Sequence, residues 1–278
     1  MTVGIAVVAY GAPELLRRAL EPVAGLPIVV IDNSSLAAVR AVCDGLDVPY
    51  VDAAANLGFA AGANLGVQDL WRKHGRVDVL LLNPDAVLTP ADVRTLQVAL
   101  HRDARTAAVA PALEGADGPQ RAAWPFPAPG RMWREAFGLL GTSRHQADWL
   151  VGAALLLNAR AIEEIGPFDE RFFLYGEETD WQRRAVLAGM AVRLVPEVTV
   201  EHVGAGTSGD LRRREALFHA GQETYIRKWA GALGWQSYRA AALVAAVIRS
   251  PLPGARGASA RLRVGLYARG PRRVAGLT

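Results

Sequence analysis

Short apolar runs alternate with amphipathic stretches along the first half of the chain. The apolar runs lie at residues 4–9, 27–31, 48–51 and 77–82, and short runs of this kind bounded by polar residues predict strands. Pro13 opens the first of the intervening helical patterns. Apolar strands separated by helices predict an α/β fold with a parallel sheet and helices on both faces.

Residues that favour helix ends mark several of these helices. Thr89 followed by Pro90 supplies a cap and a first-turn proline, which predicts a helix start. Ser34 and Ser35 can cap the helix that follows the second strand. Residues 56–74 are predicted to hold a Gly/Ala-rich loop that leads into a helix.

The second half of the chain is less regular. Residues 115–130 are rich in Gly and Pro and predict a loop. The apolar run at 149–157, with Gly152 inside it, predicts a strand. The remaining expected elements are a helix at 181–189, strands at 191–195 and 198–200, and helices at 211–229 and 238–248.

Polar groups stand at the ends of the predicted strands. In open parallel sheets, ligands bind beyond the carboxyl ends of the strands. The polar groups at Asp32, Asn56 and Asp85 all fall there. Their common placement is the first indication of a binding site.

Asp85 has two interpretations. A carboxylate at a strand end can hold a divalent ion against a diphosphate, because Mg²⁺ takes only one or two protein carboxylates beside phosphate oxygens and water. However, Asn83, Pro84 and Asp85 are all residue types that favour turns. Both interpretations stay open from these residues alone.

Three carboxylates crowd into four positions at Glu177, Glu178 and Asp180. At a helix start they complement the helix macrodipole. Beside the aromatic residues of 168–175, burial can instead raise the pKa of a carboxylate towards that of a general base.

His202 follows a strand-like run. It can act as a structural hydrogen-bonding group, or it can complete the coordination of a metal held by Asp85. Gly58, Gly62 and Gly66 lack the spacing of a dinucleotide-binding loop and lie outside the first strand–helix turn. That kind of site is therefore excluded.

The composition is that of a folded enzyme, with 51% apolar and 21% charged residues among 278. A single cysteine, Cys43, excludes an internal disulfide and a cysteine zinc cluster, and it fits a reducing compartment. The first ten residues predict a strand rather than a signal peptide. No uninterrupted apolar run reaches the ~18 residues of a transmembrane helix. We therefore expect a cytoplasmic protein.

Charge is divided unevenly along the chain. Residues 224–278 contain ten basic residues and no Asp or Glu, and subtracting these from the net charge of +4 leaves −6 on residues 1–223. Such a tail favours an anionic membrane surface, along which the apolar run at 240–248 could lie. No nucleic acid is expected, because no aromatic stacking platform accompanies the charges. The alternative is a basic end without a partner.

Eight segments carry a resemblance when they are taken in order. They are VVAY at 7–10, IDNSS at 31–35, NLGFAAGANLG at 56–66, LLNPD at 81–85, VGAALL at 151–156, GPFDERFF at 166–173, YGEETDW at 175–181 and HVG at 202–204. Together they resemble the inverting glycosyltransferase family 2, and more narrowly its bacterial rhamnosyltransferase-type branch.

The resemblance implies a GT-A fold, a mixed and mostly parallel sheet with helices on both faces. It implies a catalytic domain over 1–210, with a nucleotide-binding half at 1–110 and an acceptor half at 111–210. A helical, basic extension at 211–278 would follow.

The resemblance also implies roles for single residues. Asp32 would contact the base of the donor, and Ala9 and Tyr10 would line the nucleoside pocket. The residues expected to shape the nucleotide side of the cleft are Asn56, Gly58, Ala61 and Asn64. Those expected to bind the acceptor are Asp148, Trp149 and Gly152.

For the metal and the base, the resemblance implies specific positions. Asn83 and Asp85 stand where the family has Asp-x-Asp, so Asp85 would hold Mn²⁺ or Mg²⁺ with help from His202. The family's base is usually the Asp of a Glu-Asp pair. Glu178 stands at that position, with Asp180 and Glu177 as the alternatives.

These roles imply a single displacement that inverts the anomeric carbon. A rhamnose or a related hexose would pass from a UDP- or dTDP-sugar to a hydroxyl of a glycan or lipid-linked acceptor. The reaction would serve cell-envelope polysaccharide synthesis at the inner face of the cytoplasmic membrane. The oligomeric state is unspecified.

Two other functions compete with this one. A non-catalytic nucleotide-sugar or glycan-binding protein is suggested by Asn83 and Glu178, which depart from the family pattern. A nucleotidyltransferase would need a Gly/Arg/Lys-rich phosphate loop near residue 10, which residues 11–13 do not supply.

Overall fold

The largest element of the computed structural model, which describes residues 2–139, 148–204 and 210–277, is a nine-stranded sheet. Its strands are β1 (Val3–Ala9), β2 (Ile28–Asp32), β3 (Tyr50–Asp52), β4 (Asp78–Leu82), β5 (Ala86–Val87), β6 (Thr106–Gly115), β7 (Gly118–Gln120), β10 (Ala154–Leu157) and β11 (Ala191–His202). They follow the order β3-β2-β1-β4-β10-β6-β11-β5, and β7 pairs with β6. A separate pair consists of β8 (Ala123–Trp124) and β9 (Trp149–Leu150).

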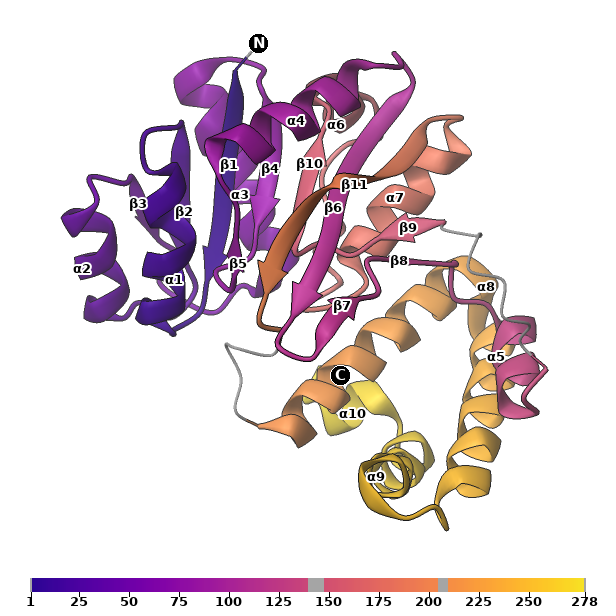
Figure 1. Cartoon of the computed structure of the whole chain (residues 1–278). Coiled ribbons are helices and arrows are strands. Elements are labelled where there is room, and N and C mark those ends of the chain that lie inside the picture. The colour runs from indigo at the N-terminus through magenta and orange to yellow at the C-terminus, as the bar shows by residue number, and fades with distance from the viewer. Residues whose placement is uncertain (1, 140–147, 205–209, 278) are drawn as a thin grey trace. The chain divides into compact units, whose positions relative to one another are not determined.

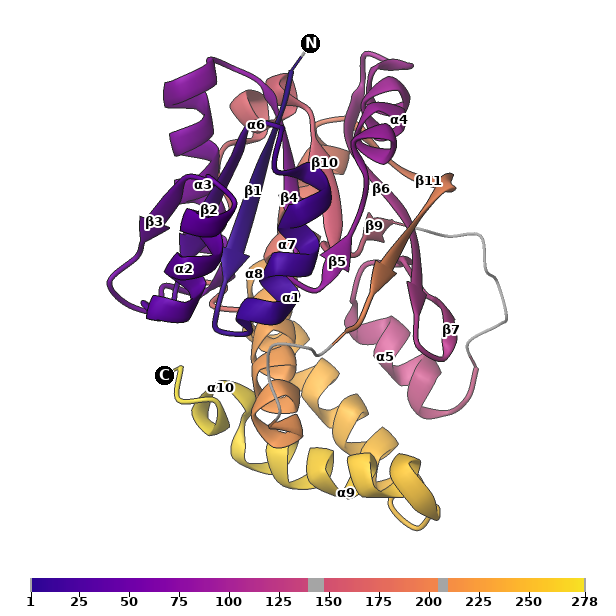
Figure 2. The ribbon, with the colours of Figure 1, turned by 60° about the vertical axis from the view of Figure 1, so that its left-hand side comes forward.

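The sheet is mixed and mostly parallel, which confirms the predicted fold class. β1 runs parallel to β2 and β4, β2 to β3, and β6 to β11. β10 is antiparallel to both β4 and β6, and β5 is antiparallel to β11. The carboxyl ends of β1, β2 and β4 therefore meet at one edge of the sheet, which Figure 2 shows for β1 and β4.

Helices cover both faces of this sheet (Figure 1). They are α1 (Pro13–Leu20), η1 (Glu21–Val23), α2 (Ala37–Gly45), α3 (Gly58–His74), α4 (Pro90–His101), α6 (Ala159–Ile165) and α7 (Glu177–Leu187). Side chains alternate between faces along a strand. Ile5 and Val7 of β1 accordingly belong to one hydrophobic core, and Ala6 and Val8 belong to the other. Each face buries a core of its own, which holds the strand ends in place.

Two glycines allow α3 to approach β1 closely. A Cβ at Gly62 would lie 2.8 Å from Cγ1 of Val8, and one at Gly66 would lie 2.7 Å from the Cβ of Ala6. Both distances are shorter than carbon–carbon contact allows. The glycines therefore serve helix–strand packing inside α3, in agreement with the exclusion of a dinucleotide-binding loop.

One of the two predicted helix caps is present. Thr89 Oγ1 accepts a hydrogen bond from the Asp92 N–H at 3.3 Å, and the Asp92 carboxylate accepts the Thr89 N–H at 2.8 Å, which forms a capping box at α4. The predicted serine cap of α2 is wrong, because Leu36 occupies the cap position and its side chain makes no capping bond. Ser34 instead donates from Oγ to Oδ1 of Asp32 at 2.5 Å.

Part of the segment predicted as a loop at 115–130 is a hairpin. β6 continues to Gly115, which pairs with Gly118 of β7 across a two-residue turn. Gly118 has a φ of 106°, a conformation that favours glycine. The residues that signal a loop in the sequence thus build a tight turn between strands.

Other boundaries in this half also differ from prediction. The single strand expected at 149–157 divides into β9 and β10. The helix expected at 181–189 begins earlier, at Glu177, because the acidic residues form its first turn. β6 itself was not predicted. Its sequence is rich in alanine and contains Pro111, and both residue types are unfavourable in strands. The register of β11 shifts next to Pro111.

The described residues form two compact units. The first comprises residues 2–125, 148–173 and 177–204 and contains the nine-stranded sheet. The second comprises residues 126–139, 174–176 and 210–277 and is helical. Its helices are α5 (Pro129–Ala136), α8 (Leu211–Arg249), α9 (Gly254–Arg269) and α10 (Pro271–Val274). The predicted helical C-terminal tail is therefore present, and we call this second part the C-terminal unit.

α8 changes direction at Gly231 (Figure 1), where φ is 71° and ψ is −173°. Beyond this bend, the apolar run at 240–248 is mainly core, since its alanines at 241, 242, 245 and 246 are buried. Val247 and Ile248 at its end remain 52% and 53% exposed. Among the described residues, every helix is too short or too polar to cross a bilayer.

Candidate active site

Asp85 and His202 lie together at the carboxyl edge of the sheet. Asp85 stands between β4 and β5, and the antiparallel pairing of β5 with β11 brings His202 opposite Ala86. Nε2 of His202 is 3.6 Å from Oδ1 of Asp85, and the Val203 N–H donates to the backbone carbonyl of Asp85 at 3.1 Å. Both side chains are largely buried, with exposures of 7% for Asp85 and 14% for His202. The two predicted metal ligands are thus neighbours.

Gln120 of β7 fixes the ring of His202. Its Oε1 lies 2.9 Å from Nδ1 of His202, and its Nε2 donates to the backbone carbonyl of the same residue at 2.9 Å. With this amide orientation, Nδ1 donates its proton to Oε1 of Gln120, and Nε2 is directed towards Asp85. Such support of the second ring nitrogen is typical of a metal-binding histidine. Gln120 carried no signal in the sequence, because it lies in the segment that was predicted as a loop.

The chemistry of this pair fits a divalent cation. A carboxylate oxygen and an imidazole nitrogen suit Mn²⁺, and Mg²⁺ accepts few protein ligands when phosphate oxygens complete its shell. Within the described residues, no group of three or more His, Cys, Asp or Glu side chains could hold a metal alone. The cation would therefore need oxygens from a bound diphosphate.

The three carboxylates at the start of α7 occupy different surroundings. Asp180 is fully buried and accepts a hydrogen bond from Nε of Arg184 at 3.1 Å. Arg184 in turn donates to the carbonyls of Ile165 and Pro167 at 2.7 Å each. Asp180 therefore anchors α7 to the preceding segment, which leaves it poorly placed to meet a substrate.

Glu177 is also buried, at 4% exposure, and within the described residues its Oε2 has no hydrogen-bond partner. Burial raises the pKa of Glu177 well above its usual value, and the nearby charge of Glu178 raises it further. A buried carboxyl of this kind favours its protonated form.

Glu178 is the half-buried member of the three, and it faces the segment between β9 and β10. A Cβ at Gly152 would lie 3.5 Å from Cγ of Glu178. The amide of Gln182 holds these elements together, since it bonds both the N–H and the carbonyl of Leu150 at 2.8 Å and also bonds the carbonyl of Glu178. The surroundings of Glu178 therefore suit the predicted base better than those of Glu177 or Asp180.

One backbone hydrogen bond joins the metal side of the site to the base side. The Asn83 N–H donates to the carbonyl of Ala153 at 2.9 Å. Asn83 lies two residues before Asp85, and Ala153 follows the Gly152 that faces Glu178. The predicted ligand thus lies two residues after Asn83, which is bonded to the segment faced by Glu178 of α7.

Asp32 ends β2 and is fully buried. Its Oδ1 accepts hydrogen bonds from the N–H and Oγ of Ser34 at 2.8 and 2.5 Å, and its Oδ2 accepts from the Leu36 N–H at 3.2 Å and from the Tyr50 hydroxyl at 3.0 Å. These bonds occupy both oxygens. The carboxylate therefore shapes the loop after β2, and direct contact with a donor base would require one of these partners to move.

Asn33, which the sequence analysis did not single out, adjoins Asp32 at the same strand end. Its Nδ2 donates to the carbonyl of Gly58 at 2.9 Å, while its buried Oδ1 has no partner within the described residues. Its N–H donates to the carbonyl of Ala9, which is itself fully buried. Tyr10, the next residue, is 48% exposed. Asn33 is itself 4% exposed, so it links the end of β2 to the start of α3 from inside the fold.

The other predicted nucleotide-side residues surround the start of α3. Oδ1 of Asn56 accepts the Gly58 N–H at 3.1 Å. Gly58 has a φ of 82° and lies against the carbonyl of Phe173, so it suits only glycine. Ala61 is half-buried one turn further on.

Asn64 has a different environment from the one predicted. Its Nδ2 donates to the carbonyl of Phe168 and to Glu170, and its Oδ1 accepts the Phe168 N–H at 2.9 Å. With its amide used in this way, Asn64 ties α3 to the segment before α7. It supports the site from inside the fold and not from the surface of the cleft.

The three predicted acceptor residues lie on or beside β9. Asp148 and Trp149 are half-buried, with the Asp148 N–H donating to the carbonyl of Trp124 at 2.9 Å and Nε1 of Trp149 to the carbonyl of Pro125 at 3.2 Å. Gly152 lies beside Glu178, as described above. All three predicted positions therefore lie on one short segment, whose Gly152 faces Glu178.

The fold and this arrangement are those of the nucleotide-diphospho-sugar transferases of GT-A type. The family model of glycosyl transferase family group 2 matches residues 79–262. The chain belongs to this family, which confirms the resemblance found in the sequence.

Relatives of known function agree with this assignment. The chain is 29% identical over 188 residues to a low-salt glycan biosynthesis hexosyltransferase of Haloferax volcanii, covering 65% of this chain and 60% of the relative. It is 30% identical over 205 residues to the N-acetylglucosaminyl-diphospho-decaprenol L-rhamnosyltransferase of Mycobacterium tuberculosis (65% and 66%). It is 32% identical over 200 residues to a galactofuranosyltransferase of Mycolicibacterium smegmatis (66% and 65%). The matches thus span less than two thirds of each relative.

Solved structures share the fold at lower identity. A mannosyltransferase from Pyrobaculum calidifontis, in complex with GDP-mannose and Mn²⁺, has a TM-score of 0.58 and 13% identity, over 99% of this chain and 86% of its own. Glucosyl-3-phosphoglycerate synthase from Mycobacterium tuberculosis, in complex with Mn²⁺, UDP-glucose and phosphoglyceric acid, has a TM-score of 0.56 and 14% identity, over 82% and 79%. These likenesses establish the GT-A fold.

Proposed function

We propose that this chain is a metal-dependent, inverting glycosyltransferase of cell-envelope glycan synthesis. It would move a hexose from a UDP- or dTDP-sugar to a hydroxyl of a glycan or lipid-linked acceptor. The observation that carries the proposal is the Asp85–His202 pair at the carboxyl edge of the sheet, with Glu178 on an adjoining segment. Solved structures of the same fold hold GDP-mannose or UDP-glucose, which supports a nucleotide-sugar donor. One relative, by its name, acts on a lipid-linked diphosphate.

In this proposal the residues divide the work between donor and acceptor. Asp85 and Nε2 of His202 would hold the cation, with Gln120 keeping the ring in the required orientation. A bound divalent ion supplies positive charge that offsets the charge of a departing diphosphate. Tyr10 would contact the nucleoside, and Asp32 and Asn33 would hold the loop beside it.

Glu178 would act as the base. Its carboxylate accepts the proton of the acceptor hydroxyl while that oxygen forms a bond to the anomeric carbon. The bond from this carbon to the diphosphate oxygen breaks on the opposite side, so the configuration inverts. Asp180 and Glu177 would support the start of α7 instead of reacting.

We also propose that the protein works at the inner face of the cytoplasmic membrane. The ten basic residues of the last 55 positions supply positive charge, and Val247 and Ile248 supply exposed apolar surface. A lipid-linked acceptor would be presented at that surface.

The decisive test is donor binding by the parent and by Asp85→Ala. Thermal stabilisation by UDP-, dTDP- and GDP-sugars should appear for the parent with Mn²⁺ and vanish in the variant, whose melting temperature without ligand should change little. Mass spectrometry of products with a diphospho-lipid acceptor should then show transfer. If the parent binds the donor but neither transfers the sugar nor hydrolyses the donor, the non-catalytic binding protein is favoured. If Asp85→Ala binds the donor as well as the parent does in the presence of Mn²⁺, Asp85 is not part of the site.

A further inference from the structure

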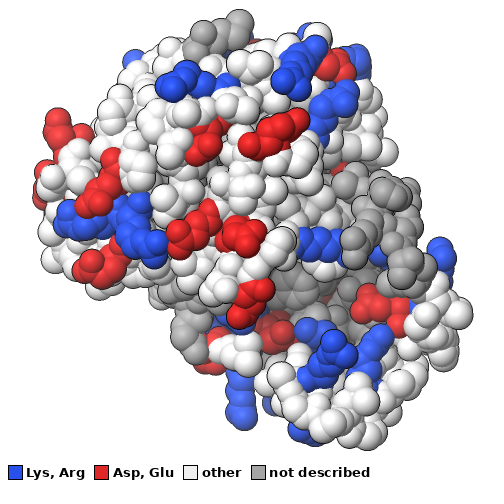
Figure 3. Space-filling model, viewed as in Figure 1, with Lys and Arg blue, Asp and Glu red and all other residues white. Residues whose placement is uncertain are grey.

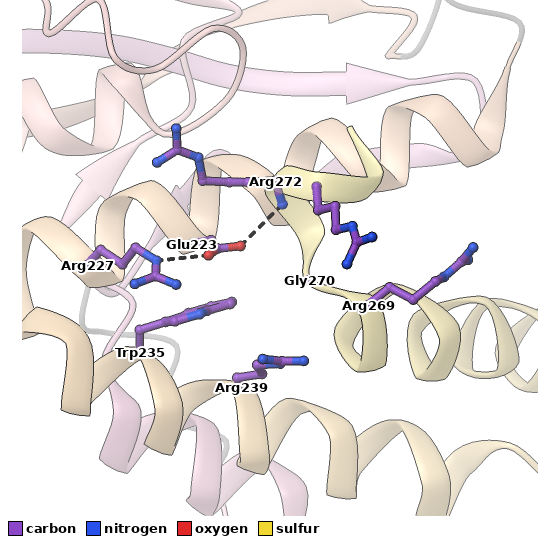
Figure 4. A pocket seen from close by; sticks show the side chains of 8 residues that line it. Glu223, Arg227, Trp235, Arg239, Arg269, Gly270 and Arg272 are labelled. Carbon is purple, nitrogen blue, oxygen red and sulfur yellow. Dashed lines mark hydrogen bonds and ion pairs between the residues drawn. The ribbon is translucent and has the colours of Figure 1, made fainter. Parts of the chain in front are cut away.

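The C-terminal unit contains a cavity of about 400 Å³ that the proposed reaction does not use. Five arginines contribute to its lining, together with one carboxylate, one indole and a glycine. These lining residues are Glu223, Arg227, Trp235, Arg239, Arg269, Gly270, Arg272 and Arg273 (Figure 4). We call this cavity the arginine pocket.

The bend in α8 and the turn after α9 bring these arginines together. Arg227 precedes the bend at Gly231 and Arg239 follows it, so both lie beside Trp235 in Figure 4. Arg269 ends α9, and Gly270, with a φ of 93°, turns the chain into α10. Arginines that are up to 46 positions apart in sequence, from residue 227 to 273, thus line one space.

Several of the guanidinium groups are held by bonds that leave other donors available. Nε of Arg227 donates to Oε1 of Glu223 at 2.8 Å, and its guanidinium lies 5.6 Å from the ring centre of Trp235. Nε and one terminal nitrogen of Arg239 donate to the carbonyls of Tyr267 and Ala268 at 2.7 Å each. Held arginines lose little conformational freedom when they bind a ligand.

The charge of the pocket is strongly unbalanced. Glu223 is the one carboxylate among its lining residues, and it is buried at 6% exposure. Both of its oxygens are used, one by Arg227 and the other by the Arg272 N–H at 3.2 Å. Figure 3 shows basic side chains gathered on the viewed face of this unit. Positive charges that line one cavity repel one another, and a bound anion would relieve this repulsion.

We propose that the arginine pocket binds a diphosphate group. Guanidinium groups pair with phosphate oxygens through two parallel hydrogen bonds, and several converging arginines suit a multiply charged anion better than a single carboxylate. The volume lies within the range of small-molecule sites. The diphosphate would be that of a lipid-linked acceptor, and this part of the inference rests on the proposed function.

The test measures binding of inorganic pyrophosphate to the full chain by calorimetry in EDTA, so that no metal site contributes. The variant Arg269→Gln/Arg273→Gln changes two exposed pocket residues, and Arg213→Gln/Arg256→Gln removes the same charge from exposed positions of this unit outside the pocket. The pocket variant should weaken binding about tenfold or more, because hydrogen bonds between a guanidinium group and a phosphate oxygen are stronger than those between neutral groups. The matched variant should stay within about twofold of the parent, the change expected from screened charge alone.

A second substitution guards against a change of fold. Arg227→Lys keeps the positive charge beside Glu223 but loses the planar fork, so it should weaken pyrophosphate binding with an unchanged melting temperature. Farnesyl diphosphate is the second probe. Tighter binding than pyrophosphate assigns the site to a lipid-linked diphosphate, and equal binding assigns it to a free one.

The outcomes separate this inference from the proposed function. No pyrophosphate binding, or an equal loss in the pocket variant and the matched variant, would overturn the arginine pocket even if Mn²⁺-dependent donor binding is intact. If the pocket variant loses pyrophosphate binding and the matched variant does not, the arginine pocket is supported even if no nucleotide-sugar binds.

Discussion

At the scale of single residues, the three carboxylates at the start of α7 are close in sequence but have different environments. Asp180 is neutralised by Arg184, Glu177 is buried with one oxygen unpaired in the described structure, and Glu178 is half-buried beside Gly152. A general base must reach the solvent or the substrate and must hold a charge at working pH. These requirements favour Glu178, and they make the three residues separable by experiment.

Glu178→Gln keeps the shape of the side chain and removes its proton affinity. Turnover should fall about 10²–10⁴-fold, which is the usual contribution of a general base. Donor binding and melting temperature should be retained. Asp180→Asn should instead lower the melting temperature, because it leaves the partly buried guanidinium of Arg184 without its counter-charge. Near-parental turnover of Glu178→Gln beside an inactive, stable Asp180→Asn would transfer the role to Asp180.

Glu177 should make stability depend on pH. Burial raises its pKa in the folded state well above the unfolded value of 4.5. The stability that its protonated form contributes is therefore complete below about pH 4.5 and is lost as the pH rises through the raised value. Glu177→Gln should gain stability relative to the parent as the pH increases over this window.

Urea unfolding of both proteins between about pH 5 and 8 measures this difference. Glu178→Gln is the control, because removing the neighbouring charge should reduce the effect without abolishing it. A constant difference between Glu177→Gln and the parent at every pH would show that Glu177 is ionised throughout.

At the scale of elements, the packing of α3 on β1 positions the strand ends that carry the site. The helix faces Val8 and Ala6 through glycine, so the two elements lie closer than any side chain would permit. Asn33 and Asn56 contact Gly58 at the start of this helix. Any displacement of α3 would therefore reach the polar groups of the nucleotide side.

Gly62→Ala should test this close approach. The added methyl would lie 2.8 Å from Cγ1 of Val8, and overpacking of this kind costs about 1–3 kcal/mol. Urea unfolding should show the loss, and donor affinity should fall with it. Gly25→Ala is the matched control, because nothing lies within 4 Å of its Cβ position. Equal stability of both variants would mean that α3 adjusts freely.

The pattern of apolar residues predicts the first half of the fold well, because β1, β2 and β4 are fully buried strands. β3 is half-buried and begins two residues later than predicted. The pattern fails where tertiary contacts decide. β6 contains Pro111 and many alanines and is a strand because β10 and β11 pair with it. Likewise, Ser34 and Ser35 resemble a helix cap, but Ser34 donates to Asp32 and Ser35 donates to Asp52.

The site follows the same division. Asp85 and Glu178 stand at motif positions, so the sequence finds them. Gln120 and Asn33 gain their significance from partners far along the chain, such as His202 at a separation of 82 positions. The ranking of the α7 carboxylates likewise depends on Arg184 and its bonds, which no local pattern encodes.

At the scale of the whole molecule, the question is where the basic tail acts. The helices α8, α9 and α10 bury Trp235, Tyr238 and Tyr267 in a core of their own. Deleting residues 236–278 would therefore destroy the C-terminal unit instead of detaching a loose tail. Point substitutions at its exposed apolar positions are the better test of membrane attachment.

Val247→Asp/Ile248→Asp should weaken sedimentation with vesicles that contain anionic lipid. The two side chains are about half exposed, and acidic replacements both remove apolar contact and repel the lipid. Raising the salt concentration should weaken binding of the parent as well, because part of the attraction is screened. Leu233→Asp is the control, since Leu233 is 87% exposed but lies at the bend of α8. No sedimentation of the parent at low salt would refute membrane attachment.

The two-residue turn between β6 and β7 has a consequence for engineering. Residues added at 116–117 would lengthen the loop and leave the pairing of Gly118 with Gly115, and so the position of Gln120, unchanged. Successive side chains of a strand point to opposite sides, so one residue added between Gly118 and Gln120 would turn Gln120 away from His202. Libraries that vary this hairpin should therefore tolerate insertions in the turn and lose function with an insertion inside β7.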